Sequence, residues 1–279
     1  MDARPEGSQR VKQPESDAAP MPGEHYRSLA ALADGYFWHW TRRRLLLECA
    51  RASAAPFDAY LDVGCGLGLG TLLAARDLVA SRLARPGLVT VGLDHPAVGA
   101  TERLTPAGRF VGVDFDAADC ALGRLPGGGP ALVSCMDVLE HLRQPAALAS
   151  SIAGALRPGD LALFTVPAGA WLWSDWDVRL GHLRRYSRAG LVRELAGAGL
   201  EVVRSGHLFS WAVLPGLWRA RRKQAGGTEF PAVSPLVNAA LKAAGRLELL
   251  LSRVARVPIG TSAWALARRS AAGVAPPHE

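Results

Sequence analysis

The chain has 279 residues, of which 49% are hydrophobic and 20% charged, and its formal net charge at pH 7 is +7. This composition indicates a globular protein with one large domain and excludes a disordered chain. No basic run is interleaved with aromatic residues, so the positive charge does not favour nucleic-acid binding. The four cysteines include no Cys-x-x-Cys pair. Neither a zinc knot nor a disulfide framework is supported, and a reducing cytoplasm fits.

The two ends of the chain differ in composition from the middle. Residues 1–24 are rich in Pro, Ser and charged side chains and lack the apolar core of a signal peptide, so we expect a disordered leader. We also expect a disordered tail at 271–279. The longest charge-free apolar stretch, at 161–174, is too short to span a bilayer. The sequence therefore predicts a soluble protein, or at most one peripheral to a membrane.

In chain order, a helical pattern over 25–51 is followed by apolar strands that alternate with helical patterns. Such continuous apolar strands are typical of a parallel sheet that helices cover on both faces. A helix at 187–199 leads to a further strand, and about sixty residues then separate it from the last strand. The predicted strands are 59–63, 88–93, 109–113, 130–135, 160–166, 200–203 and 261–268.

The most informative stretch is Tyr60-Leu-Asp-Val-Gly-Cys-Gly-Leu-Gly-Leu-Gly70. A strand, a glycine turn and a helix together bring backbone close to a ligand and point helix N–H groups at it. The dinucleotide fingerprint does not fit, because Leu69 or Thr71 stands where its third glycine should be, and no Gly-Lys-Ser/Thr of a Walker loop follows. The stretch resembles the first motif of class I S-adenosylmethionine (SAM)-dependent methyltransferases.

The resemblance implies an α/β fold: a Rossmann-like, seven-stranded, mostly parallel sheet with helices on both faces and an antiparallel last strand. It implies that SAM is the cofactor, S-adenosylhomocysteine the product and a small molecule the methyl acceptor. Residues 25–209 would form the SAM-binding domain with an N-terminal helical lid, 210–257 a helical insert and 258–270 the last strand. Within the family, the chain is similar to ubiquinone-biosynthesis O-methyltransferases of the bacterial small-molecule branch.

Acidic residues follow the predicted strands where a nucleoside would bind. Asp94 ends the second strand, from which a carboxylate can accept both ribose hydroxyls. In the family, an acidic and an apolar residue after the third strand clamp the adenine, which favours Asp114 with Phe115 and leaves Asp116 as a competitor. The residues expected to bind the cofactor are Asp62, Gly64, Cys65, Gly66, Gly68, Asp94, His95, Asp114, Phe115, Met136 and Asp137.

The phrase Asp137-Val-Leu-Glu140-His141 ends the fourth strand and is frequent in the small-molecule branch. On a helical turn these three side chains fall within an arc of about 100° and can converge. They could pack and cap the turn, ligate a divalent ion as the corresponding segment does in the ubiquinone enzymes, or supply His141 as a general base. We favour the first interpretation and predict no obligatory metal.

A long loop rich in Trp, His and Arg follows the fifth strand, and such loops at a sheet edge are often functional. It resembles a stretch of several bacterial methyltransferases, but Trp176 stands where those proteins commonly have His. His182 is therefore the sharper candidate base, unless it and Tyr186 only bond backbone before the next helix. The predicted catalytic residues are His182, His141 and Asp137, and the predicted substrate contacts are Trp173, Asp177, Arg185 and Tyr186.

The insert at 210–257 carries an apolar stripe and a basic cluster formed by Arg219, Arg221, Arg222 and Lys223. The stripe must be covered by the sheet domain, by a second subunit or by anionic lipid, and we favour the sheet domain. A cytoplasmic monomer or homodimer is expected, and contact with the inner face of a membrane is less favoured. Two rivals remain: a non-catalytic SAM-binding protein on the same fold, and a membrane-associated enzyme for a lipid-linked substrate. The acceptor atom, O, N or C, stays open.

Overall fold

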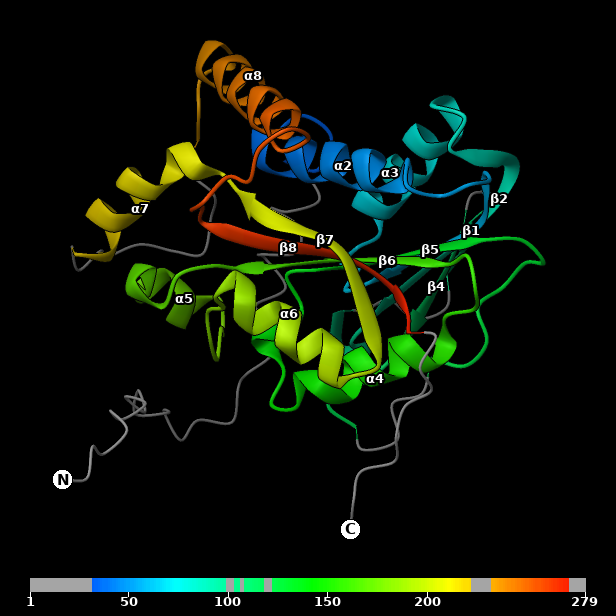
Figure 1. Ribbon diagram of the computed structural model, residues 1–279. Helices are drawn as coiled ribbons and strands as arrows, with labels where there is room; N and C mark the ends of the chain where they lie inside the picture. Colours follow the sequence, from blue (N-terminus) through cyan, green and yellow to red (C-terminus); the bar gives the residue numbers. More distant parts are fainter. Residues whose placement is uncertain (1–31, 99–102, 106–107, 118–121, 222–231, 271–279) are drawn as a thin grey trace, which may run out of the picture.

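A computed structural model describes residues 32–98, 103–105, 108–117, 122–221 and 232–270 (Figure 1). In this part of the chain a single sheet of eight strands has the order β3-β4-β2-β1-β5-β6-β8-β7. The strands are β1 (Phe57–Val63), β2 (Ala84–Asp94), β3 (Arg103–Thr105), β4 (Gly108–Gly112), β5 (Ala131–Met136), β6 (Leu161–Pro167), β7 (Leu200–Leu208) and β8 (Ser262–Arg269).

The sheet is parallel from β4 through β2, β1 and β5 to β6, and β8 runs antiparallel to both of its neighbours. The predicted mostly parallel sheet with an antiparallel last strand is therefore confirmed. The short β3, antiparallel to β4, is an addition to the seven predicted strands. The strand order reverses at β1, whose two neighbours are β2 and β5, and ligands of open α/β sheets bind at such a reversal.

Helices cover both faces of the sheet (Figure 1). Above it lie α2 (Phe37–Ala50), α3 (Leu69–Ala80) and α8 (Pro235–Leu251), and below it lie α4 (Pro145–Ala155), α5 (Asp175–Arg179) and α6 (Arg188–Gly197). The remaining helix, α7 (Val213–Ala220), stands at one end of the molecule. Because both faces are covered, alternate residues of one strand enter different cores: Phe164 of β6 packs below the sheet and Leu163 above it.

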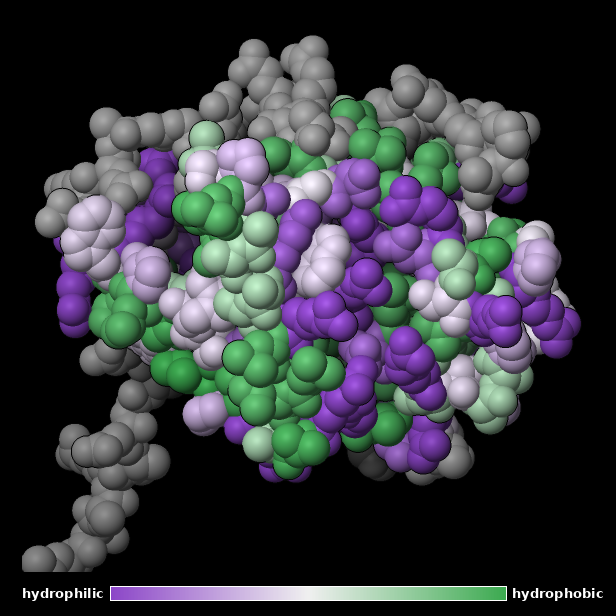
Figure 2. Space-filling model, turned by 90° about the horizontal axis from the view of Figure 1, so that it is seen from above, coloured by the Kyte–Doolittle hydropathy of each residue, from purple (hydrophilic) through white to green (hydrophobic). Residues whose placement is uncertain are grey.

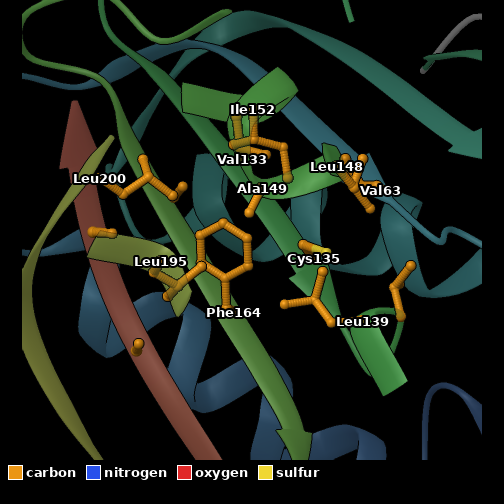
Figure 3. Packing of buried hydrophobic residues seen from close by; sticks show 14 of the residues in the cluster. Val63, Val133, Cys135, Leu139, Leu148, Ala149, Ile152, Phe164, Leu195 and Leu200 are labelled. Atoms are coloured by element: carbon orange, nitrogen blue, oxygen red, sulfur yellow. The ribbon is translucent and has the colours of Figure 1, made fainter. Parts of the chain in front are cut away.

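The lower core shows why the central strands read as continuous apolar runs. Figure 3 shows Phe164 pointing into the space between α4, which supplies Ala149 and Ile152, and α6, which supplies Leu195. All four side chains are fully buried. A strand that is packed on both faces has no solvent side on which polar residues could alternate.

Three element boundaries differ from the sequence prediction by four residues or more, and one of them is the end of β7, which was expected at 203 and lies at Leu208. Residues 33–36 form a turn that contains Gly35, so α2 begins at Phe37 and not at 25. The Phe37 N–H donates to the side-chain oxygen of Asn238 at 2.8 Å, a tertiary contact that local periodicity does not reveal. β2 begins at Ala84, ahead of Pro86 and Gly87, because Phe57 pairs with Ala84 before a bulge.

Several predictions lie outside the described residues: the leader at 1–24, the first part of the helix at 25–31, Arg222 and Lys223, and the tail at 271–279. Within the described ranges, no helix is both long and apolar enough to cross a membrane.

Candidate cofactor and acceptor site

A cavity of about 840 Å³ lies at the carboxyl ends of β1, β2, β4 and β5. Its walls come from the glycine loop after β1, the ends of the neighbouring strands, the loop around His182, and residues of α2 and α7. The volume is large for a ligand pocket, for which about 300–1,000 Å³ is usual, so more than one small molecule fits. The cavity thus lies at the strand reversal, where ligands of open α/β sheets bind.

The glycine loop forms one wall. Gly64, Gly66 and Gly68 all have positive φ angles, of 81°, 56° and 84°, which side-chain-bearing residues rarely adopt. A Cβ at Gly64 would overlap Val138, and one at Gly68 would overlap Phe110. α3 begins directly after Gly68, so its first-turn N–H groups lie at this wall. The loop can accept a ligand against bare backbone.

Asp62 fixes the loop from behind. Its carboxylate accepts hydrogen bonds from the hydroxyls of Thr71 at 2.5 Å and Ser134 at 2.6 Å, which ties β1 to α3 and β5. Burial raises the pKa of Asp62 to about 6, against the opposing effect of these hydroxyls. Asp62 lines the cavity, but both of its oxygens are already used by the protein.

Asp94 ends β2 inside the cavity and also holds the loop. Its Oδ2 accepts the Gly66 N–H at 2.5 Å, and its Oδ1 accepts the His95 N–H at 2.7 Å. Burial raises the pKa of Asp94, although these two bonds oppose the shift. His95 is exposed at the rim and Cys65 is buried beside the loop, and both line the cavity.

The residues after β4 lie at the same cavity. Phe115 is buried, while Asp114 and Asp116 are exposed, and all three line the wall. Asp114 accepts the Asp116 N–H at 3.0 Å, and Asp116 accepts the Arg143 N–H at 3.0 Å. Asp114 and Asp116, the two candidates for the adenine contact, thus lie on one wall. Asp116 is already hydrogen-bonded to the turn after β5.

Asp137, directly after β5, pairs with a cation that the sequence prediction did not place in the site. It has a positive φ of 57°, and its N–H donates to the Thr165 carbonyl at 2.9 Å. Its carboxylate forms an ion pair with Arg42 of α2, and Arg42 also donates to the Thr165 hydroxyl at 2.7 Å. Met136, Asp137 and Arg42 all line the cavity. One signal could have found Arg42: it shares a helix face with the apolar Leu45 and Leu46.

Glu140 is completely buried, and neither carboxylate oxygen has a hydrogen-bond partner among the described residues. Burial, reinforced by the nearby charge of Asp137, raises the pKa of Glu140 well above its ordinary value and so favours the neutral form of the side chain. The rings of His141 and His182 lie edge to face with centroids 4.9 Å apart. Ligand atoms of Glu140, His141 and His182 lie within 4.8 Å of one another, so this group could hold a metal ion. His182 takes the place that the sequence prediction gave to Asp137.

His182 and Arg185 line the cavity, and the buried carboxylate of Asp177 lies behind both side chains. Asp177 Oδ1 lies 2.8 Å from His182 Nδ1 and accepts the Arg185 Nε–H at 2.7 Å. Burial alone would raise the pKa of Asp177, but the hydrogen bonds from His182 and Arg185 hold it below its ordinary value. The backbone of α5 supports this geometry, because Asp177 Oδ2 accepts the Ser174 N–H at 2.9 Å.

Three of the four predicted substrate contacts stand back from the cavity. Trp173, Asp177 and Tyr186 do not line it, and Arg185 does. The Tyr186 N–H donates to the Pro167 carbonyl at 2.9 Å, so this residue joins the loop to the end of β6. Other aromatic residues form the wall instead. Among them are Trp176, Trp211 and Trp218, and the guanidinium of Arg219 lies over the Trp176 ring at 4.4 Å.

Comparison with known proteins decides the family. Residues 37–205, more than half of the chain, match the model of a methyltransferase domain family. The chain belongs to the methyltransferase family. A Mycolicibacterium smegmatis protein assigned as a SAM-dependent methyltransferase is 30% identical over 66% of this chain and 66% of its own length. A ubiquinone biosynthesis O-methyltransferase of Xanthomonas campestris is 32% identical over 38% of this chain and 41% of its own length.

The chain thus spans about two thirds of the first of these relatives and less than half of the second. Among solved structures, the [4+2]-cyclase SpnF has the same fold, with a TM-score of 0.52 and 19% identity over 90% of this chain and 98% of its own. SAM is the cofactor of the family, and the cavity fits it. Side chains at Gly64 and Gly68 have no room beside the loop, a carboxylate ends β2, and an aromatic ring follows β4.

Proposed function

We propose that this methyltransferase transfers a methyl group from SAM to a hydroxyl of a small-molecule acceptor. The observation that carries the proposal is His182, which faces the cavity with its Nδ1 2.8 Å from the buried carboxylate of Asp177. When bound, SAM supplies an activated methyl group, so the protein has to align the acceptor and remove its proton. A neutral amine needs no strong base, whereas a hydroxyl does, and an Asp–His pair is suited to that task.

The donor end of the cavity supports the placement of SAM. Asp94 would accept the ribose hydroxyls and Phe115 would cover the adenine, with Asp114 taking its amino group. Arg42 of α2, which pairs with Asp137 beside the end of β5, would receive the carboxylate of the donor's amino-acid part. That contact would compete with the Arg42–Asp137 ion pair. Asp62 would act indirectly, because Thr71 and Ser134 already occupy its oxygens.

The acceptor end supports the role of His182. With Nδ1 hydrogen-bonded to Asp177, Nε2 is left to take the acceptor proton. The Asp177 carboxylate would then stabilise the imidazolium, and Arg185 would hold that carboxylate in place. His141 lies next to His182, with the two rings edge to face. Three tryptophans and the guanidinium groups of Arg185 and Arg219 line this end, which favours a planar acceptor with an anionic group.

A non-catalytic SAM-binding protein, or a different reaction on the same fold, is the rival, since the fold of SpnF serves a cyclase. The test is to incubate the chain with isotope-labelled SAM and cell extracts and to identify labelled products by mass spectrometry. With an acceptor in hand, His182→Ala should lower kcat by about 10²–10⁴ while SAM affinity stays within about threefold. His207→Ala, which alters a histidine outside the cavity, is the matched control. SAM binding without transfer to any acceptor would favour the rival.

A further inference from the structure

The outer side of α8 is apolar and exposed. The helix packs on α2 and buries only Gly245, Glu248 and Leu249. Most of the stripe that we expected the sheet domain to cover points away from it: Leu236 is 81% exposed and Val254, just beyond the helix, 85%. Residues 236, 240, 243, 247, 250 and 254 are all exposed and follow one another at steps of three or four, which places them in a single row. The sheet domain therefore covers only the inner side of this helix.

The neighbouring α7 extends this surface. Leu214 is 77% exposed and Trp218 more than half exposed. Figure 2, seen from above, shows a broad hydrophobic area in the left half of this side, where Figure 1 places α7 and α8. We use "apolar face" for the exposed residues Leu214, Trp218, Leu236, Leu247, Leu250, Leu251 and Val254.

The exposed charges on the described part of 210–257 are positive. Arg221, Arg246 and Arg256 are exposed near the apolar face. In the described part of 210–257 the only acidic residue is Glu248, which is buried and accepts the N–H groups of Phe209 and Ser210, both at 2.7 Å. On α2, Glu48 is paired with Arg253. Anything that covers the apolar face must therefore tolerate several positive charges.

We propose that the apolar face binds the surface of an anionic lipid bilayer. Apolar side chains beside arginines suit the boundary between acyl chains and negatively charged headgroups. A second copy of the chain fits less well, because two-fold pairing along α8 would bring Arg246, near the middle of the helix, close to its counterpart. α8 has 17 residues and would lie along the interface without crossing it. Because α7 carries Leu214 outside and Gly216 on the cavity wall, the bilayer would lie beside the cavity.

The test is flotation of the full chain with vesicles of phosphatidylcholine alone and of phosphatidylcholine with phosphatidylglycerol, at low and high salt. We expect flotation only with the anionic vesicles, and less of it at high salt. Leu250→Ser should weaken binding about tenfold and Arg246→Gln about fivefold. Val178→Ser on α5 and Arg193→Gln on α6 change exposed residues of the same kinds below the sheet, and should leave binding unchanged.

Circular dichroism of each variant establishes that it is folded. Three results would overturn the proposal: no flotation with anionic vesicles, equal losses in the α8 variants and their controls, or a dimer in sedimentation equilibrium that Leu250→Ser dissociates in the absence of lipid. The last result would assign the apolar face to a second copy. Because the readout is lipid binding, failure here leaves the proposed methyl transfer untouched.

Discussion

The Asp94 carboxylate has two roles. It accepts the Gly66 N–H and so holds the glycine loop, and it is proposed to accept the ribose hydroxyls. We predict that Asp94→Ala lowers SAM affinity about ten- to a hundredfold, because a hydrogen bond to a charged group contributes about 1.5–3 kcal/mol. Titration calorimetry measures the effect. Asp175→Ala, at an exposed position of α5, is the control. Unchanged SAM affinity in a folded Asp94→Ala protein would contradict the assignment.

Glu140 is predicted to be replaceable by its neutral isostere. Burial raises the pKa of this carboxyl and favours its protonated form, whose charge and shape Glu140→Gln preserves, so kcat should stay within about threefold. Treatment with EDTA should leave activity unchanged in both proteins, in line with the prediction of no obligatory metal. Activity lost with EDTA and restored by Mg²⁺ or Zn²⁺, with Glu140→Gln inactive, would instead identify Glu140, His141 and His182 as metal ligands.

At the residue scale, the sequence located groups that follow directly from local order. The glycine loop and Asp94 belong to one strand–turn–helix unit and the strand beside it, so motif and position sufficed. The proximity of Glu140 to His182 and of Arg42 to Asp137 depends on packing between distant segments. The Leu183 N–H, for example, donates to the Glu140 carbonyl at 2.8 Å across the cavity wall. Such contacts leave no periodic trace in the sequence.

At the scale of elements, the seven apolar strands were predictable because each is buried on at least one face. β3 was not predicted, because Arg103–Thr105 is too short to show a hydrophobic pattern. The apolar stripe of the insert predicted a helix. It did not predict the direction in which the stripe points. Amphipathicity identifies an apolar side and does not say which neighbour covers it. Glu248 and Leu249, which face inward, fix that orientation.

Glu248 joins α8 to the end of β7, where Phe209 adopts a left-handed φ of 61°. We predict that Glu248→Ala lowers the free energy of unfolding by about 2–4 kcal/mol, because one buried and one partly buried N–H group lose their carboxylate acceptor. Urea denaturation measures this change. Glu201→Ala, which breaks the exposed pair with Arg268, should lower the free energy of unfolding far less. Equal losses in the two variants would show that α8 is not fastened through Glu248.

At the scale of the whole molecule, the pKa shift of Asp62 makes the free energy of unfolding depend on pH. Its folded pKa of about 6 exceeds the ordinary value of 3.8, so between these values the folded state holds a proton that the unfolded chain has released. Stability from this group is therefore full at low pH and is lost as pH rises through about 6. The loss is on the order of 3 kcal/mol.

Asp62→Asn should remove this dependence, because asparagine does not titrate. The measurement is the free energy of unfolding in urea from pH 4.5 to 7.5 for both proteins. The difference between them isolates Asp62 from other titrating groups, among them Asp94, whose pKa is also raised. A difference that stays constant across this range, or that changes with the opposite sign, would contradict the pKa assigned to Asp62.

α2 lies between the cavity and the outer surface. On one side its Arg42 pairs with Asp137 inside the cavity, and on the other its Thr41 packs on Gly245 of α8 so closely that a Cβ there would have no room. If the donor displaces Asp137 from Arg42 and α2 moves, α8 must follow. Thermodynamic reciprocity then requires that whatever factor SAM adds to bilayer affinity, the bilayer adds to SAM affinity. Through α2, binding of SAM in the donor site and attachment of α8 to lipid would thus be thermodynamically coupled.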